Sequence, residues 1–213
     1  MRRVTVRSAA LRAATIRPAQ DVELHLSEQS GRRVKRRYTI RHYRRDVDEM
    51  DLDVLLHGAG PGARWGAAAG PGEIVRFQGP RGKLELRPAP WHLLVGDESA
   101  IPAIASICEA LPTGERATAV IEVGEPADQL PVLADVRWVH RGEAAAGGSE
   151  WLAAALEALV VPADARAYLL GETRAMVALR ALLERRGITH ESIFVKGYWN
   201  LGRPDRIAGR APT

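Results

Sequence analysis

The stretch His92-Leu93-Leu94-Val95-Gly96-Asp97-Glu98-Ser99-Ala100-Ile101-Pro102 decides the fold of the second half of the chain. Its apolar start predicts a buried strand over residues 92–95, and Gly96 permits a tight turn. Asp97 can cap a helix that continues to about Leu111, and proline is favoured in a first helical turn. Strand, glycine turn and helix in this order indicate a parallel sheet that binds ligands at the carboxyl ends of its strands. The same residues are equally consistent with a well-capped helix that binds no ligand.

The alternation of strands and helices continues beyond this stretch. We expect further strands at residues 118–123, 136–139, 167–170 and 192–195, and helices at residues 151–159 and 173–186. Leu170-Gly171-Glu172 repeats the sequence of strand end, glycine and helix start. The pattern predicts an α/β domain with a parallel sheet over residues 89–202, followed by an unstructured tail over residues 203–213.

The first half of the chain has a different rhythm. Short alternating runs, separated by glycine and proline, predict strands at residues 22–26, 52–56 and 73–77. Such spacing is typical of a small antiparallel barrel or sandwich. We therefore expect a two-domain α+β protein whose first domain, residues 1–88, is an antiparallel β-barrel. Because only 35 residues precede Arg36, the barrel is expected to be abridged.

Composition and charge exclude several classes of protein. The chain has 213 residues, of which 46% are hydrophobic, and its longest nearly apolar stretch of about ten residues is too short for a transmembrane helix. A single cysteine, Cys108, excludes an internal disulfide and a cysteine-based metal site. Residues 1–45 hold 13 basic and three acidic side chains, whereas the rest of the chain is mildly acidic. The basic segment permits nucleic-acid binding, but its arginines alternate with apolar residues as in a strand.

Two segments of the first half carry side chains suited to an anionic cofactor. In Arg36-Arg37-Tyr38-Thr39-Ile40-Arg41, an arginine for a phosphate lies beside a flat tyrosine and a threonine donor. In Leu56-His57-Gly58-Ala59-Gly60-Pro61-Gly62-Ala63-Arg64-Trp65, glycines permit close approach of the backbone, and a helix of one or two turns near Gly62 would direct its N-terminus at a phosphate. The alternatives are an exposed basic strand or nucleic-acid patch, and a structural role for His57.

The last motif is Phe194-Val195-Lys196-Gly197-Tyr198-Trp199-Asn200-Leu201-Gly202. Adjacent tyrosine and tryptophan residues at a strand end are unusual in a chain with 5% aromatic residues. Core packing explains Trp199 and solvation explains Lys196, while their combination slightly favours a surface that faces a ligand.

Taken in order, these motifs resemble the siderophore-interacting protein family of flavin-dependent ferric reductases, in the ferredoxin-reductase-like superfamily. The resemblance covers roughly residues 34–202. Its elements are Arg36-x-Tyr38-Thr39-x-Arg41, Asp53-x-x-Leu56-His57-Gly58-x-Gly60-Pro61-x-x-x-Trp65, Gly79-Pro80-Arg81-Gly82, Leu94-x-Gly96-Asp97-Glu98-Ser99-Ala100-Ile101-Pro102-Ala103-Ile104, Gly171-Glu172 and Gly197-Tyr198-Trp199-x-x-Gly202. Each motif alone is modest, and six in this order are specific.

The resemblance implies particular site residues. FAD would be held by Arg36, Tyr38, Thr39, His57, Gly58, Ala63 and Trp65, with the arginine near the pyrophosphate. NADH or NADPH would dock near Asp97, Ser99, Ala100, Gly171 and Glu172. An anionic ferric siderophore would be received by Lys196, with Arg141 or Arg45.

The implied activity is reduction of ferric siderophores or related iron(III) chelates by NAD(P)H through FAD, with release of iron as Fe(II). No acid–base catalytic residue, no resident metal and no nucleic-acid or membrane partner are expected, and the expected location is the cytoplasm. The alternatives are a general flavin reductase and a non-catalytic or flavin-poor relative that binds iron chelates. The charge of Glu122, at the end of a central strand, would disfavour a 2′-phosphate. The sequence does not define an oligomeric state.

Overall fold

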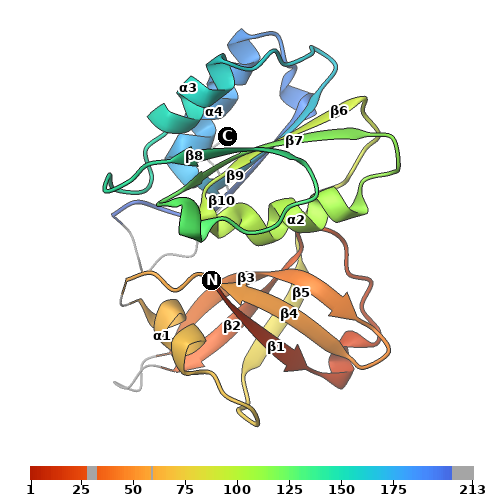
Figure 1. Ribbon diagram of the computed structural model, residues 1–213. Helices are drawn as coiled ribbons and strands as arrows, with labels where there is room; N and C mark the ends of the chain where they lie inside the picture. Colours follow the sequence, from red (N-terminus) through yellow and green to blue (C-terminus); the bar gives the residue numbers. More distant parts are fainter. Residues whose placement is uncertain (28–32, 59, 203–213) are drawn as a thin grey trace. The chain divides into compact units, whose positions relative to one another are not determined.

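The computed structural model describes residues 1–27, 33–58 and 60–202 (Figure 1). The chain divides into two compact units, Met1–Leu84 and Glu85–Thr213, so that the division falls at Leu84 rather than at residue 88. Each unit has its own sheet of five strands. The predicted tail, residues 203–213, lies outside the described residues.

The first unit is an antiparallel sheet with one short helix. Its strands pair in the order β1-β4-β3-β2-β5, which confirms the antiparallel first half and leaves β1 and β5 as the outer strands of the described sheet. The elements are β1 (Arg2–Arg7), β2 (Asp21–Ser27), β3 (Arg33–Arg44), β4 (Glu49–Val54), α1 (Pro61–Ala68) and β5 (Arg76–Arg81), with a 3-10 turn η1 (Ala9–Leu11) after β1.

Alternation of apolar side chains builds the core of this unit. Val22, Leu24 and Leu26 on β2 are buried and pack with Leu52 of β4 and Leu11 of η1. Strand β3 serves both halves of the sheet, because its first part pairs with β2 and its second part with β4, with a register shift between Ile40 and His42. Such irregularities bend a strand and let one sheet curve around its core.

One predicted strand of the first unit is displaced. The strand expected at residues 73–77 is β5, Arg76–Arg81, and Ile74 before it is 96% exposed. The hydrogen-bonded partners on β2, from His25 opposite Arg76 to Asp21 opposite Arg81, set the position of β5. The alternation of apolar and polar residues at 73–77 therefore did not predict where β5 begins. Its position depends on pairing with β2, about 50 residues earlier in the chain.

The second unit is the predicted parallel α/β sheet. Its strands pair in the order β10-β9-β6-β7-β8, and every pair is parallel. The elements are β6 (Trp91–Gly96), η2 (Glu98–Ala100), α2 (Ile101–Ala110), β7 (Arg116–Val123), η3 (Pro126–Asp128), β8 (Asp135–His140), α3 (Glu150–Glu157), β9 (Arg166–Glu172), α4 (Thr173–Arg185), η4 (His190–Ser192) and β10 (Ile193–Trp199).

Helices cover both faces of this sheet. Figure 1 shows α2 on one face and α3 with α4 on the other. Leu152 and Leu156 of α3, with Leu179 and Leu183 of α4, pack against buried strand residues such as Leu93. Each fully buried leucine contributes about 1.5–3 kcal/mol of transfer free energy, so this core holds the strand ends in fixed positions. The arrangement brings the carboxyl ends of five strands to one edge of the sheet.

Candidate functional site

In the first unit, two side chains of β3 contact the start of α1. Arg36 and Tyr38 are two residues apart, so both lie on one face of the strand. A Cβ atom at Gly62 would collide with the Tyr38 hydroxyl oxygen and lie 3.6 Å from Cγ of Arg36. Only glycine therefore allows the first turn of α1 to approach these two side chains so closely.

The N-terminus of α1 is open to an anion. Gly60 is the N-cap residue, no side chain caps the helix, and the first turn holds no acidic residue. The N–H groups of a first turn have no partner within their own helix and carry the positive end of its dipole. The side chain of Arg36 passes close to this turn at Cγ, and its guanidinium donates to the carbonyl oxygen of Lys35 at 2.9 Å. A phosphate is the kind of ligand that such a turn and an arginine bind together.

Aromatic side chains form the rest of this group. The ring of Trp65, on α1, lies 5.7 Å from the Tyr38 ring, measured between centroids. Burial raises the pKa of Tyr38 to about 12, so the phenol keeps its proton and remains a hydrogen-bond donor at neutral pH. The structure thus brings Arg36, Tyr38, Ala63 and Trp65 together around the first turn of α1.

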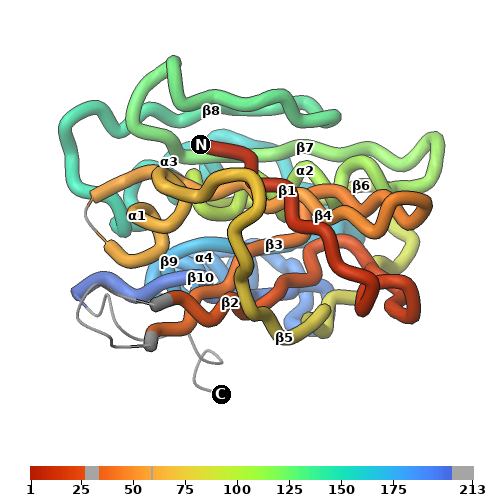
Figure 2. Tube along the Cα trace, turned by 90° about the horizontal axis from the view of Figure 1, so that it is seen from below, coloured from red at the N-terminus to blue at the C-terminus, as the bar shows by residue number. Residues whose placement is uncertain are grey.

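Other predicted residues of the first unit lie elsewhere. Thr39 is buried and, as the neighbour of Tyr38 on a strand, faces the opposite side of β3. His57 and Gly58 are exposed in the connection between β4 and α1, where Gly58 has a φ of +60°. Arg45 follows the end of β3 and donates to the carbonyl oxygens of Arg12 and Ala14. Figures 1 and 2 show α1 and the β3–β4 hairpin at opposite ends of this unit. Arg36 is near the start of β3 and Arg45 follows its end, so most of the strand separates them.

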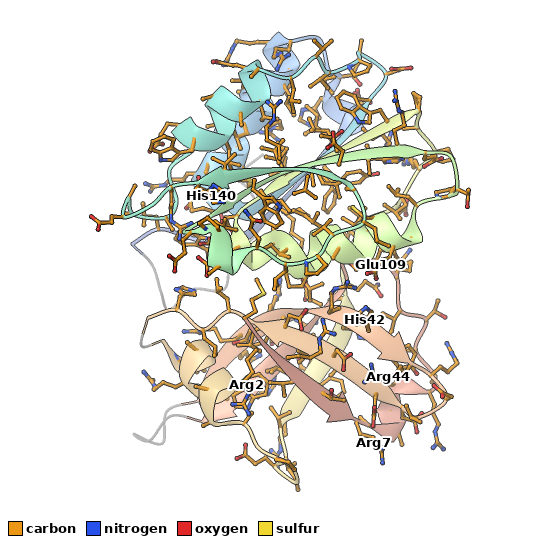
Figure 3. All side chains as sticks on the ribbon, in the orientation of Figure 1. Arg2, Arg7, His42, Arg44, Glu109 and His140 are labelled. Carbon is orange, nitrogen blue, oxygen red and sulfur yellow. The ribbon has the colours of Figure 1, made fainter. Side chains whose placement is uncertain are left out.

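Much of the positive charge of the first unit is compensated within it. Figure 3 shows Arg7 and Arg44 on the strands near the β3–β4 hairpin, and Arg2 beside α1. Arg2 donates to the carbonyl oxygens that end α1. The ion pairs of the other basic residues are Arg3–Asp53, Arg7–Glu49, Arg12–Asp48, Arg44 with Glu49 and Asp51, and Lys35, Arg37 and Arg81 with Glu23. The excess of arginine in the sequence therefore does not translate into an equally basic surface.

In the second unit, the Asp97 carboxylate joins three strand ends. Its Oδ1 accepts from the N–H and the hydroxyl of Ser99. Its Oδ2 accepts from the N–H of Glu172, at the end of β9, at 3.0 Å and from Nε1 of Trp199, at the end of β10, at 2.8 Å. Burial raises the pKa of the Asp97 carboxyl, although the bonds from Ser99 and Trp199 lower it. A Cβ atom at Gly171 would lie 2.7 Å from Oδ2, so this junction requires glycine there.

The remaining predicted dinucleotide residues lie around the same junction. Glu172 caps α4, since its Oε2 accepts from the N–H of Ala175 at 2.8 Å, while its Oε1 accepts from the N–H of Leu201. Ala100 is fully buried beneath the Gly96 turn. Asp97, Ser99, Ala100, Gly171 and Glu172 therefore occupy one edge of the sheet, and the two acids mainly fix its backbone.

Trp199 has a larger part in this edge than its sequence motif indicated. Besides the bond from its indole to Asp97, its carbonyl oxygen accepts from Oγ1 of Thr173 at 3.0 Å. A Cβ atom at Gly147 would lie 2.8 Å from Cη2 of Trp199, so the loop before α3 closes tightly over the ring. In the sequence, the Gly-Tyr-Trp motif pointed to Trp199 as a site residue. No motif pointed to Thr173 or Gly147.

The two predicted chelate-binding cations of the second unit are separated. Lys196 lies on β10 and Arg141 follows β8, and these are the two outer strands of the sheet. Nζ of Lys196 lies 5.1 Å from the centroid of the Tyr198 ring, within range of a cation–π interaction. Arg141 forms ion pairs with Glu98 and Glu122, so its charge is neutralised by neighbours.

Across residues 1–27, 33–58 and 60–202, no group of three or more His, Cys, Asp or Glu side chains is arranged to hold a metal ion. In the same residues, no helix has the length and apolar character needed to cross a membrane.

An antiparallel sheet with an anion-binding helix start, followed by a parallel sheet with a glycine turn after its first strand, defines a two-domain protein built to bind nucleotides. The siderophore-interacting FAD-binding domain matches residues 8–84, and the siderophore-interacting protein family matches residues 89–202. The chain therefore belongs to the siderophore-interacting protein family, as its motifs predicted. Its first unit is the FAD-binding domain, which confirms FAD as a cofactor.

Individual relatives agree with this assignment. The chain is 34% identical over 180 residues to the ferric vibriobactin reductase of Vibrio cholerae, an alignment that covers 80% of this chain and 66% of that protein. A siderophore utilization protein from T. fusca is 30% identical, with a TM-score of 0.85 over 94% of this chain and 87% of that one. The FAD/NAD-binding domain of a nitric oxide dioxygenase from Vibrio cholerae, 16% identical with a TM-score of 0.69 over 93% and 92% of the two chains, shares the fold.

Proposed function

We propose that this chain is an FAD-dependent reductase that uses NAD(P)H to reduce ferric siderophores or related iron(III) chelates and releases iron as Fe(II). The observation that carries the proposal is the close contact of the α1 start with Arg36 and Tyr38, in a domain that belongs to an FAD-binding family. The ferric vibriobactin reductase relative supports iron-chelate reduction as the reaction. A location in the cytoplasm stays a prediction.

The residues of the first unit fit FAD. The cradle at Gly62, the uncapped start of α1 and the Arg36 guanidinium suit a pyrophosphate. The protonated Tyr38 phenol supplies a donor, and Trp65 supplies an apolar wall next to it. When bound, FAD supplies the redox chemistry, because a flavin accepts a hydride and passes on single electrons. Arg36, Tyr38 and Trp65 bind and orient it, and no side chain needs to transfer a proton in this role.

The second unit would position the nicotinamide nucleotide. Asp97 ties Ser99, Glu172 and Trp199 into one rigid edge, which holds the backbone N–H groups and the Gly171 turn in place. Preorganisation of this kind lets a bound nucleotide keep one geometry during transfer. Ser99 and Gly171 are the predicted contacts at this edge.

An anionic iron chelate would be received by positive charge. Lys196 beside Tyr198 remains the leading candidate on the second unit, and Arg45 on the first, while Arg141 is engaged by two carboxylates. Hard anionic oxygen ligands bind iron(III) far more strongly than iron(II), so reduction releases the metal without acid–base catalysis. Lys196→Ala is expected to raise the KM for the chelate without changing flavin content, and Lys83→Ala, a lysine outside this group, is the control.

The first experiment is a visible spectrum of the purified chain with and without added FAD. Arg36→Ala is expected to weaken FAD binding roughly 10- to 100-fold, since a hydrogen bond to a charged group contributes about 1.5–3 kcal/mol. Arg76→Ala, an exposed arginine of the same unit, should bind FAD as the unmodified chain does. A chain without a flavin spectrum after FAD addition would refute the proposal.

Turnover distinguishes the proposed activity from its alternatives. Oxidation of NADH and NADPH would be followed with ferric siderophores, free flavin and quinones as acceptors, and Fe(II) would be trapped by a coloured chelator. Preference for ferric chelates supports the proposal. Equal or faster turnover of free flavin indicates a general flavin reductase, and flavin binding without any turnover indicates a non-catalytic relative.

A further inference from the structure

Three charged side chains form a compact group at the carboxyl end of β7. Glu98 comes from η2, Glu122 is the residue before last of β7, and Arg141 follows β8 directly. Nη2 of Arg141 forms an ion pair with Oε1 of Glu98, and its Nη1 lies 3.6 Å from Oε1 of Glu122. The side chains are 11%, 2% and 14% exposed, respectively, so the group is shielded from solvent and its charges interact strongly.

This group stands where a parallel sheet of this kind recognises the adenosine end of a dinucleotide. β6 carries the glycine turn, and β7 is the next strand both along the chain and in the sheet. In dinucleotide-binding sheets, an acidic side chain near this point bonds to the 2′-hydroxyl of the ribose, whereas a nearby arginine accommodates a 2′-phosphate. Here both types of side chain are present, and they are paired with each other.

The chemistry of the unused atoms favours a hydroxyl. Among the residues that the structure describes, Oε2 of Glu122 and Nη1 of Arg141 are buried and have no hydrogen-bond partner. One is an acceptor and the other a donor, so a ribose hydroxyl can bond to both, whereas a phosphate offers acceptors only.

The surrounding charge disfavours a phosphate. Asp97 and Glu150 add their negative charges to those of Glu98 and Glu122 around one guanidinium. Burial raises the pKa of Glu122 to about 7, so close to neutral pH this carboxyl still carries part of its charge. A 2′-phosphate, with one or two negative charges of its own, would have to take Arg141 from Glu98 and remain beside uncompensated carboxylates.

We propose that Glu122 and Arg141 select a nicotinamide dinucleotide with a free 2′-hydroxyl, so that this chain uses NADH in preference to NADPH. Glu98 contributes by holding the Arg141 charge within the protein. The inference rests on the proposed function and specifies its electron donor. Three observations support it. The pair lies at the carboxyl end of β7, the second strand of this unit. The pair offers an unused donor and an unused acceptor, and carboxylates outnumber positive charges around it.

The test compares binding of the two nucleotides to the full chain loaded with FAD, by calorimetric titration with NAD⁺ and NADP⁺, and turnover with NADH and NADPH. The unmodified chain is expected to bind NAD⁺ at least tenfold more tightly than NADP⁺. Glu122→Gln keeps the shape of the side chain and removes its charge, and should reduce this ratio tenfold or more. Glu98→Gln releases Arg141 and should reduce the ratio through tighter NADP⁺ binding.

Glu157→Gln, an exposed charge change at the end of α3, should leave the ratio unchanged. Equal binding of both nucleotides by the unmodified chain, or tighter binding of NADP⁺, would overturn the inference while leaving the reductase proposal intact. An unchanged ratio in both Glu122→Gln and folded Glu98→Gln would also overturn it. If neither NAD⁺ nor NADP⁺ binds, and neither NADH nor NADPH reduces the flavin, the inference and the NAD(P)H-dependent function are overturned together.

Discussion

The Asp51 carboxylate of β4 shows how single residues compensate the basic start of the chain. Two nitrogen atoms of Arg44 donate to it at 2.6 and 2.8 Å, and the Thr5 hydroxyl donates at 2.8 Å. The residue is 3% exposed, so its charge depends on these donors. The bonds from Arg44 outweigh burial and lower the pKa of Asp51 to about 2. A depressed pKa means that the ionised form stabilises the folded state.

Asp51→Asn is therefore expected to lower the free energy of unfolding by roughly 1–2 kcal/mol at neutral pH. This is less than the full pKa shift implies, because Arg44 is partly exposed and solvent screens its charge. The loss should shrink as the pH falls from 3.8, the ordinary pKa of an aspartate, toward about 2, because the unmodified carboxyl then takes up a proton as well. Urea titrations of the unmodified chain and of Asp51→Asn, at neutral pH and below pH 4, measure this loss of unfolding free energy. Asp46→Asn, exposed in the β3–β4 turn, is the control. A loss independent of pH would contradict this account.

The sequence alone predicted best those contacts that join residues close together in the chain. Asp97 was predicted to cap the turn after β6, and it accepts from the N–H of Ser99 two residues away. Its bonds to Glu172 and Trp199 join residues 75 and 102 positions distant, and no spacing rule reaches across such separations. The ion pairs of Arg141, predicted as a chelate ligand, could not be read from the sequence either, because Glu98 and Glu122 become its neighbours only in the folded sheet.

At the scale of elements, α1 depends on two glycines on the face that meets the sheet. A Cβ atom at Gly66 would collide with Val54 of β4, as one at Gly62 would with Tyr38 of β3. The expected helix of one or two turns near Gly62 is confirmed as Pro61–Ala68. Its glycine content, poor for helix propensity, is explained by close packing and not by the helix itself.

Gly62→Ala is expected to lower stability by about 1–3 kcal/mol through overpacking and to weaken FAD binding, because the start of α1 must move away from Tyr38. The double variant Gly62→Ala with Tyr38→Phe removes the colliding hydroxyl and should recover most of the stability. Gly70→Ala, where a Cβ atom would make only an ordinary contact with Glu73, serves as control. Thermal unfolding and FAD titration of the four proteins provide the measurements. Absence of recovery in the double variant would show that the contact with Tyr38 is not the cause.

The observed strand boundaries agreed with the sequence pattern where helices bury both faces of a sheet. The parallel strands of the second unit are continuous apolar runs between helices, and β6, β7 and β9 were predicted close to their observed bounds. In the antiparallel first unit, β5 was displaced because its register comes from β2. Long-range pairing, and not local alternation, limits prediction there.

At the scale of the whole molecule, each unit has a core of its own. Buried residues of β2, β3 and β4 form one cluster, and those of the second sheet with α3 and α4 form another. Glu98, Glu122 and Arg141 belong to the second unit, whereas Arg36 and Tyr38, the proposed FAD residues, belong to the first. Under the proposed function, each cofactor therefore has its main protein contacts within a different unit.

We accordingly expect two thermal transitions in calorimetry, each of which responds to one ligand, because a ligand stabilises only the unit that binds it. FAD at about 100 times its Kd adds roughly 2.7 kcal/mol, which should raise the Tm of the 84-residue first unit by roughly 10–20 °C. NADH should raise the other transition, and NADPH should raise it less. Hydrogen exchange assigns each transition to its unit. At the same FAD concentration, Arg36→Ala should reduce the shift of the first transition to about half or less, while the response to NADH stays unchanged. A single transition raised equally by both ligands would mean that the two cores unfold together and that contacts across residues 84 and 85 outweigh the independence of the two cores.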